Sequence, residues 1–555
     1  MRKTLTMTIL VFFLAMPSIP VIAAQQSDED PFAGAELWKQ RPVLGAQPTL
    51  VAMVEFSDQK FRHSRAQVEE IIKIVDNFVR SGSYGRAWLE YYIHPKVITL
   101  PKPHSYYGAP SPGAQRGDDP ARLIEYMKTS IDILKTREKI DITKYKHVIL
   151  IHAGEDEADG TSPTNIWSVC YMGLDFQILL EKGYRFEELK EVYKKTQWAV
   201  YADAIDFLLH KKPDGSWHLL NGVETVAAEA GPFLASTIAH EFTHSMWISD
   251  HYVYGKDGYG VGNEVGVWTN MDYGPFLDPP VDIDGWSKYL LGWVEAVTVE
   301  KDGEYTIHTL DKPDEPHALI IPINDKEYYF IHARRPVKND AALPSPGILV
   351  FRVNKYMWGN VVGEPFMVQL MDANQGPPEC EEKSKQYSDS EGYMTLCVKF
   401  DAAYFSAPGI TKSWTLKYVD GSSDGPFTIN LSGFEFVSEE GFRVAVVSFD
   451  PDAGVARLRV GLGGKSGGET SVVTVTRTVT GTVTNTLYTT SSVVGTETRT
   501  VVVTVTTKQT PAPTYEGYIS IAIILAALVM MLGLIASRRR RTLPPPPPPP
   551  PPQAR

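Results

Sequence analysis

Residues 239–251 read Ala-His-Glu-Phe-Thr-His-Ser-Met-Trp-Ile-Ser-Asp-His, and this stretch decides how the rest of the chain is interpreted. It contains His-Glu-x-x-His, a pattern typical of the metal-binding helix of zinc peptidases. Residues four apart share one face of a helix, so His240 and His244 can present two imidazoles to one metal ion. Glu241 lies about 100° round the helix, from where it can reach a water molecule beside that metal.

The opposite side of the same helix carries Ile238, Phe242 and Met246, which can pack into a core. The alternative interpretation is an ordinary amphipathic helix with two histidines on its polar face, because short motifs also occur by chance. The segments that follow in the chain favour the metal site.

Length and charge limit the classes of protein that fit. A chain of 555 residues exceeds one typical domain, and its hydrophobic fraction of 43% suits a sizeable core. The formal net charge of −12 makes nucleic acid an unsuitable partner.

Both ends of the chain carry an apolar run beside basic residues. Arg2 and Lys3 precede the first run, which predicts a secretory signal peptide over residues 1–24, the alternative being an uncleaved anchor. The second run, residues 518–536, is about one bilayer long, and four arginines follow it. Because positive charge stays cytoplasmic, we expect a single-pass cell-membrane protein whose N-terminal ectodomain is extracellular and whose tail, 537–555, is basic and polyproline-rich.

Between these ends the sequence divides into a catalytic part and a β-rich part. A polar lead or short pro-segment, 25–46, precedes residues 47–296, where strands alternate with helices and which we expect to form an α/β (α+β) layered catalytic domain. In this part 87–100 resembles a strand pair broken at Pro95, and 147–152 a central strand. Residues 297–464 read as strand after strand, which predicts an all-β, sandwich-like domain.

A Thr/Val-rich run, 465–515, leads towards the apolar segment. Beside a membrane such a run is typical of an extended, O-glycosylated stalk. Of the three cysteines, Cys380 and Cys397 lie in the β-rich part, where an oxidising compartment favours a disulfide over two buried thiols. Cys170 is expected to be buried and unpaired.

Several segments in order resemble the immune inhibitor A family of zinc metallopeptidases, in the metzincin-like group. Beyond the zinc helix these include residues 83–85, 151–154, 166–168, 268–271, 284–293 and 347–353, within a match over about 49–449. The resemblance implies a zincin/metzincin-like catalytic domain, a Zn²⁺ cofactor and the motif His-Glu-x-x-His-x-x-Gly-x-x-Asp.

Carried over onto this sequence, the motif implies that His240, His244 and Asp250 bind zinc and that Glu241 is the general base. Met271 would form the methionine turn under the metal. Tyr273 would hydrogen-bond the oxyanion, as in some metzincins, the alternative being a packed tyrosine.

One position departs from the family pattern. Trp247 stands where the family has glycine, and glycine lets the chain leave the helix with a positive φ. Two other residues therefore compete with Asp250 for the third ligand position. His251 is one residue out of register, and Glu264 has the spacing of a second-helix ligand but lies among glycines, which disfavour a helix.

The sequence thus predicts a cell-surface zinc metalloendopeptidase that hydrolyses extracellular polypeptides. The alternative is an adhesion or binding protein built on a catalytically impaired protease fold, which Trp247 favours.

Two acidic loops suggest Ca²⁺ as a further ion, although solvated loops are the commoner explanation. Their residues are Glu155, Asp156 and Asp159 in the first loop, and Asp278, Asp282 and Asp284 in the second.

Overall fold

The computed structural model describes residues 30–114, 117–157, 162–255, 260–371, 373, 410–431, 435–463, 485–489 and 492–497. The chain divides into two compact units, Met1–Gly463 and Gly464–Arg555. The predicted signal peptide, the apolar segment 518–536, the cytoplasmic tail and the pair Cys380/Cys397 lie outside the described residues. Within the described part of the chain, no helix combines the length and apolar character that crossing a bilayer requires.

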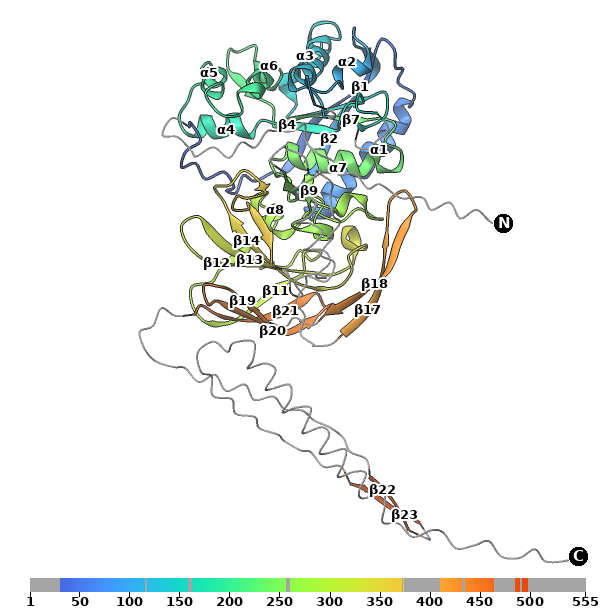
Figure 1. Cartoon of the computed structure of the whole chain (residues 1–555), viewed down its shortest axis with the longest axis vertical. Helices are drawn as coiled ribbons and strands as arrows, with labels where there is room; N and C mark the ends of the chain where they lie inside the picture. The colour runs from blue at the N-terminus through green and yellow to red at the C-terminus, as the bar shows by residue number, and fades with distance from the viewer. Residues whose placement is uncertain are drawn as a thin grey trace, which may run out of the picture. The chain divides into compact units, whose positions relative to one another are not determined.

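The first unit is a mixed α/β structure with several sheets (Figure 1). Its first sheet has the order β2-β1-β3-β7-β4. The strands are β1 (Gly45–Glu55), β2 (Ala87–Thr99), β3 (His147–His152), β4 (Val169–Met172) and β7 (Gly222–Ala227). The first four strands in this order are parallel, whereas β4 pairs antiparallel to β7 and forms one edge. The predicted central strand is confirmed as β3, every residue of which is buried.

Strand β2 corrects one prediction. Residues 87–99 form a single strand rather than a pair broken at Pro95. Its register against β1 shifts between Val51 and Met53. Val51 pairs with Ile93 and Met53 pairs with Val97, so the three residues between Ile93 and Val97 form a bulge. A proline fits there because it lacks the N–H that a regular ladder would need.

Helices cover both faces of this sheet. On one face, α1 (Arg65–Gly82) packs beside α7 (Leu234–Ser245), the helix of the His-Glu-x-x-His motif. On the other face lies α3 (Pro120–Thr136), whose Tyr126 hydroxyl is 2.9 Å from Oγ1 of Thr225 on β7. Side chains of one strand alternate between faces, so the neighbouring Glu224 faces α7.

A long insertion separates β4 from β7 in the sequence. It contains α4 (Leu174–Glu181), α5 (Leu189–Tyr193), the 3₁₀ helix Ala199–Ala204, α6 (Ile205–Leu208) and the hairpin β5 (Leu209–Lys211)–β6 (Trp217–Leu219). In Figure 1 these helices gather at the β4 side of the sheet. Short α2 (His104–Tyr107) packs against α3.

After α7 the chain makes short elements around the site. Strands β8 (Val253–Tyr254), β9 (Gly260–Gly262) and β15 (Asn360–Val361) form a small sheet. The helix α8 (Gly285–Leu290) follows.

The predicted β-rich part forms two main sheets. One has the order β10-β12-β13-β14-β16 and the other β11-β21-β20-β19. Their bounds are β10 (Ala296–Thr298), β11 (Gly303–His308), β12 (Ala318–Pro322), β13 (Glu327–Arg334), β14 (Gly347–Asn354), β16 (Val368–Leu370), β19 (Glu435–Val437), β20 (Arg443–Asp450) and β21 (Val455–Gly461). A buried core that contains Ile307, Ile331 and Leu458 lies between them, as a sandwich requires.

The opposite face of the first of these sheets belongs to the large core that also contains α7. The pair β17 (Ile410–Lys417)–β18 (Ser423–Leu431) lies beside this part. In the second unit, β22 (Asn485–Thr489) and β23 (Ser492–Glu497) pair antiparallel within the predicted stalk. The domain boundaries themselves stay predictions.

Candidate metal centre

The end of α7 determines where Asp250 lies. Met246 caps the helix, and Trp247 follows it with a φ of 74°. The N–H of Trp247 donates to the carbonyl of His244 at 2.7 Å, and the N–H of Ile248 donates to that of Thr243 at 3.3 Å. This pair of hydrogen bonds is the Schellman motif, which normally has glycine at the position of Trp247. The sharp exit from the helix therefore forms without the glycine.

The side chain of Trp247 offsets part of this cost. Its indole Nε1 donates to the carbonyl of Asn221 at 2.9 Å, and the ring packs against the large core. A left-handed conformation costs a non-glycine residue about 1 to 2 kcal/mol. Burial of most of an indole repays an amount of that order.

Both motif histidines are held in one orientation by main-chain carbonyls. Nδ1 of His240 is 2.8 Å from the carbonyl oxygen of Asn270, and Nδ1 of His244 is 2.7 Å from that of Ile248. A carbonyl only accepts, so each Nδ1 carries the proton and donates it. In the neutral ring, Nε2 then presents a bare lone pair, as a metal-binding histidine requires.

The two lone pairs converge on Asp250. Nε2 of His240 and Nε2 of His244 each lie 3.2 Å from Oδ1 of Asp250, and all three side chains are buried. Asp250 Oδ1 has no hydrogen-bond donor among the described residues. Three electron-pair donors facing one point repel unless a cation lies between them, so the residues fit a divalent metal such as zinc.

Within the described residues this is the only group of three or more His, Cys, Asp or Glu side chains whose ligand atoms all lie within 4.8 Å of one another.

Glu241 stands beside this cluster and is almost fully buried. Burial raises the pKa of its carboxyl to about 8, with Asp250 adding to the rise, while His240 and a main-chain hydrogen bond from Cys170 act in the opposite direction. Its Oε2 has no partner among the described residues. A carboxylate in this environment binds a proton readily, as a general base must.

The two competing ligands lie elsewhere. Nδ1 of His251 is 3.3 Å from Oδ2 of Asp284, and its ring packs on Trp286. Glu264 is buried but lies outside the cluster. The geometry thus favours Asp250 among the three candidates.

The turn predicted to lie under the metal contacts the site through its main chain. Asn270 holds His240 as described, and the carbonyl of Met271 accepts from the N–H of His251 at 2.8 Å. Met271 itself is fully buried in the large core. Tyr273 is also fully buried, and its hydroxyl donates to that of Tyr418 at 3.1 Å, so its oxyanion role stays a prediction.

The residues of the second acidic loop have partners of their own. Oδ2 of Asp282 is 2.7 Å from Nζ of the buried Lys288. Asp284 caps α8 by accepting from the Ser287 N–H, and its Oδ2 accepts from the Thr269 hydroxyl at 2.8 Å. Asp278 shares no cluster with them.

In the first acidic loop, Asp156 accepts from the hydroxyl of Ser168, and Asp159 lies outside the described residues. Glu155 is exposed at the start of this loop. Neither loop gathers a calcium-binding set among the described residues.

Two residues of the site escaped prediction from the sequence. The hydroxyl of Tyr254 donates to Oδ2 of Asp250 at 2.5 Å. Its only sequence signal is the alternation Tyr-Val-Tyr after His251, which indicates a strand. Glu224 on β7 is fully buried, has no hydrogen-bond partner for either oxygen among the described residues, and has a pKa raised well above its ordinary value by burial and by Glu241.

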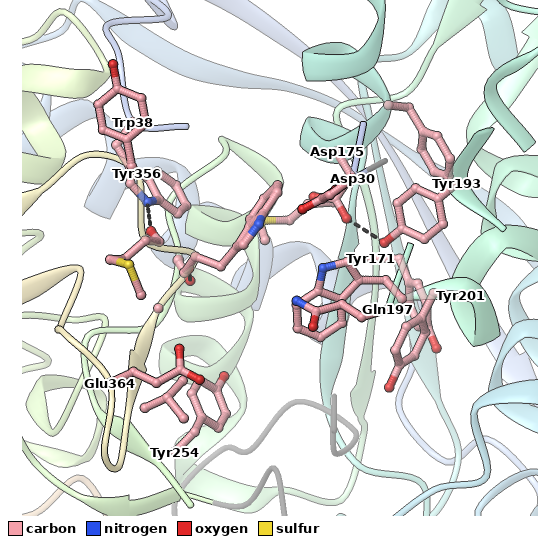
Figure 2. Close-up of a pocket in the computed structure, with 18 of the residues that line it drawn as sticks. Asp30, Trp38, Tyr171, Asp175, Tyr193, Gln197, Tyr201, Tyr254, Tyr356 and Glu364 are labelled. Carbon is pink, nitrogen blue, oxygen red and sulfur yellow. Dashed lines mark hydrogen bonds between the residues drawn. The ribbon is translucent and has the colours of Figure 1, made fainter. Parts of the chain in front are cut away.

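A cavity of about 450 Å³ is lined in part by residues that contact the cluster, though not by the three candidate ligands or Glu241 themselves. Two of its lining residues contact the cluster or its neighbour. Tyr254 donates its hydroxyl to Asp250, and the main chain of Cys170 hydrogen-bonds Glu241. Figure 2 shows aromatic side chains on opposite sides of it, with Trp38 and Tyr356 on one side and Tyr171, Tyr193 and Tyr201 on the other. A cavity of this size is in the range of ligand sites.

Comparison with known proteins adds little to this geometry. No protein-family model matches the chain, and no curated protein sequence matches it. Among solved structures, the chain is similar to catalytically inactive OgpA from Akkermansia muciniphila in complex with an O-glycopeptide (glycodrosocin) substrate, at 9% identity and a TM-score of 0.24, covering 71% of this chain and 97% of that one. Wild-type OgpA in a P 21 21 21 crystal gives 10% identity, a TM-score of 0.24 and coverage of 71% and 96%. A likeness of this size carries no argument about activity.

Proposed function

We propose that the protein is a zinc-dependent metalloendopeptidase of the immune inhibitor A type, with a metzincin-like fold. The observation that carries the proposal is the convergence of His240 Nε2, His244 Nε2 and Asp250 Oδ1 on one point. The glutamate next to the first histidine supports it, because it places a buried carboxylate beside that point.

The chain's own residues supply the proton transfers. When bound, zinc polarises a peptide carbonyl and lowers the pKa of a water molecule to about 7. Glu241 takes the proton of the attacking water and passes it to the leaving amine. Asn270 and Ile248 keep the two imidazoles in the tautomer that leaves Nε2 free, and Tyr254 fixes the second oxygen of Asp250.

A polypeptide substrate suits the edge of the first sheet. The edge strand β4 lies against β7 on one side only, and Cys170 of this strand contacts Glu241 through its main chain. An extended peptide can add to such an edge by main-chain hydrogen bonds, which brings its own peptide bonds close to the general base.

The alternative, a binding protein on an impaired protease fold, drew its support from Trp247. Because Trp247 adopts the positive φ of the family's glycine, Asp250 reaches both histidines, and this residue no longer favours that alternative. We further propose that the enzyme acts at the cell surface, with the apolar segment 518–536 as its anchor and no nucleic-acid partner.

The test is Glu241→Gln in the full-length, zinc-loaded protein. We expect the variant to lose casein cleavage by at least a hundredfold and to keep about one zinc per chain, because the ligands are intact. His244→Ala should lose both zinc and cleavage. Proteolysis by Glu241→Gln at the wild-type rate, or a wild-type protein that holds no zinc, would refute the proposal.

A further inference from the structure

We propose that the aromatic cavity beside the metal cluster is a specificity pocket for a cationic side chain, lysine or arginine, of the polypeptide substrate. This inference rests on the proposed function and names the substrate class of the same site.

The cavity is placed to read a residue next to the bond that is cleaved. Tyr254 connects it to Asp250 by the 2.5 Å hydrogen bond, and Ser249 lines it one residue before Asp250. On the other side, Val169 to Met172 of the edge strand β4 line it. A peptide bond held at the metal would therefore have a neighbouring side chain within reach of the cavity.

The charge of the lining is negative. The side chains of its lining that carry a formal charge at neutral pH are the carboxylates of Asp30, Asp175 and Glu364 and one ammonium group, that of Lys326. Oε1 of Glu364 is buried without a hydrogen-bond donor among the described residues. Oδ2 of Asp175 accepts from the Tyr193 hydroxyl at 2.6 Å, the one donor that contacts this carboxyl among the hydrogen bonds described. The carboxyls thus have room for a cationic donor.

The walls suit the rest of such a side chain. Aromatic faces attract cations by their quadrupole, and the methylene stem of lysine or arginine packs along apolar surface. The indole of Trp38 is fixed by a 2.6 Å hydrogen bond from its Nε1 to the carbonyl of Met357. The buried hydroxyl of Tyr171 has no partner among the described residues, so it offers a further polar contact inside the cavity.

A neutral apolar side chain fits less well. It would cover the carboxyls of Glu364 and Asp175 and leave them without a cation, and burying an unpaired polar group is unfavourable. Burial already raises the pKa of Glu364 and raises that of Asp175 to about 6, against the hydrogen bond from Tyr193. A bound ammonium or guanidinium group would relieve this cost.

The test compares peptides that differ in one residue. The full-length, zinc-loaded protein is given quenched-fluorescent peptides that carry Arg, Lys, Leu or Phe at one position flanking the cleaved bond. We expect kcat/KM to be at least tenfold higher for Arg or Lys than for Leu. Glu364→Gln and Asp175→Asn should each lower this ratio about tenfold. The exposed Glu90→Gln on β2 is the matched control and should leave the ratio unchanged.

A wild-type preference for Leu or Phe, or a ratio that neither pocket variant changes, overturns the inference while casein cleavage still supports the proposed function. Zinc content and thermal unfolding check that each variant is folded. If no peptide is cleaved at all, the proposed function fails. In that case the affinities of the wild type for arginine methyl ester and norleucine methyl ester test the pocket separately. A higher affinity for the arginine ester supports the inference of a cation pocket, and equal affinities overturn it.

Discussion

Trp247 shows how one residue combines backbone strain with side-chain packing. Its φ of 74° is the conformation that glycine adopts at low cost, yet its indole donates to Asn221 and packs on the core. The two effects have opposite signs and can be separated, because alanine removes the packing alone and glycine removes both.

We expect Trp247→Ala and Trp247→Gly to be less stable than the wild type, by roughly 2 kcal/mol or more for the alanine variant. The glycine variant should be more stable than the alanine variant by about 1 kcal/mol, because only alanine retains the strain. Denaturant unfolding at constant zinc measures both differences. An alanine variant as stable as the glycine variant would show that the turn is unstrained.

At this scale the helical spacing correctly placed His240 and His244 on one face of α7, whereas their metal-binding role and the role of Glu241 as general base stay predictions. Asp250 was less certain because its position depends on the turn after the helix, and a tryptophan there argued against that turn. Tyr254 was missed because its contact with Asp250 depends on the path of the chain after the turn.

Among the elements, the start of α8 is tied to the turn beside the metal site through one residue, the N-cap Asp284. Asp284 accepts from Ser287 at the start of the helix and from Thr269, two residues before Met271. Its pKa lies below the ordinary value despite burial, chiefly through His251. These contacts give the carboxylate of Asp284 a structural role. The acidic composition of the loop alone had suggested that it binds calcium.

Asp284→Ala should lower the free energy of unfolding by about 2 to 3 kcal/mol, from the lost cap and the buried donors left unpaired. Asp284→Asn retains the capping oxygen and should fall between the alanine variant and the wild type. Thermal unfolding, with zinc constant and with or without added calcium chloride, measures both. A wild-type melting temperature that calcium raises, and an alanine variant that calcium no longer affects, would restore the calcium interpretation.

A strand with a clear apolar run was predictable as an element, and β3 lies where residues 147–152 placed it. The bulge of β2 was not, because proline in a strand sequence signals a break as readily as a bulge. The aromatic cavity was not either, since β4, the insertion and the segment around Trp358 meet only in the folded chain.

Over the whole first unit, the α/β part that contains α7 and the β-rich part share one core. Phe330 and Phe351 belong to the same core as Phe242 of α7. A buried ion network also connects them, because Arg334 of β13 is 2.9 Å from Oδ2 of Asp340 and donates to the carbonyls of Asp282 and Trp268. The sequence indicated two domains from the change in pattern, and this shared core could not be read from it.

A fragment of residues 47–296 should therefore neither fold cooperatively nor hold zinc. A fragment of residues 30–463 should fold cooperatively and hold zinc. Cutting at 296 exposes the apolar face that β12 to β14 cover and leaves the carbonyls that bind Arg334 without a donor. Circular dichroism, thermal unfolding and zinc content of the two fragments measure this. A shorter fragment that melts cooperatively with zinc bound would show that the predicted boundary separates two autonomous domains.

The outer border of the first sheet has a consequence for solubility. Strand β2 is thirteen residues long and lies at the edge, so a strand of another copy of the protein could pair with its free N–H and C=O groups. The bulge around Pro95 interrupts the regular spacing of the strand's hydrogen-bonding groups, which makes it a poorer partner for a further strand. Lateral growth of the sheet into aggregates is therefore discouraged at this border. If the opposite border, β4, takes up the substrate as proposed, the two borders differ in their openness to another chain.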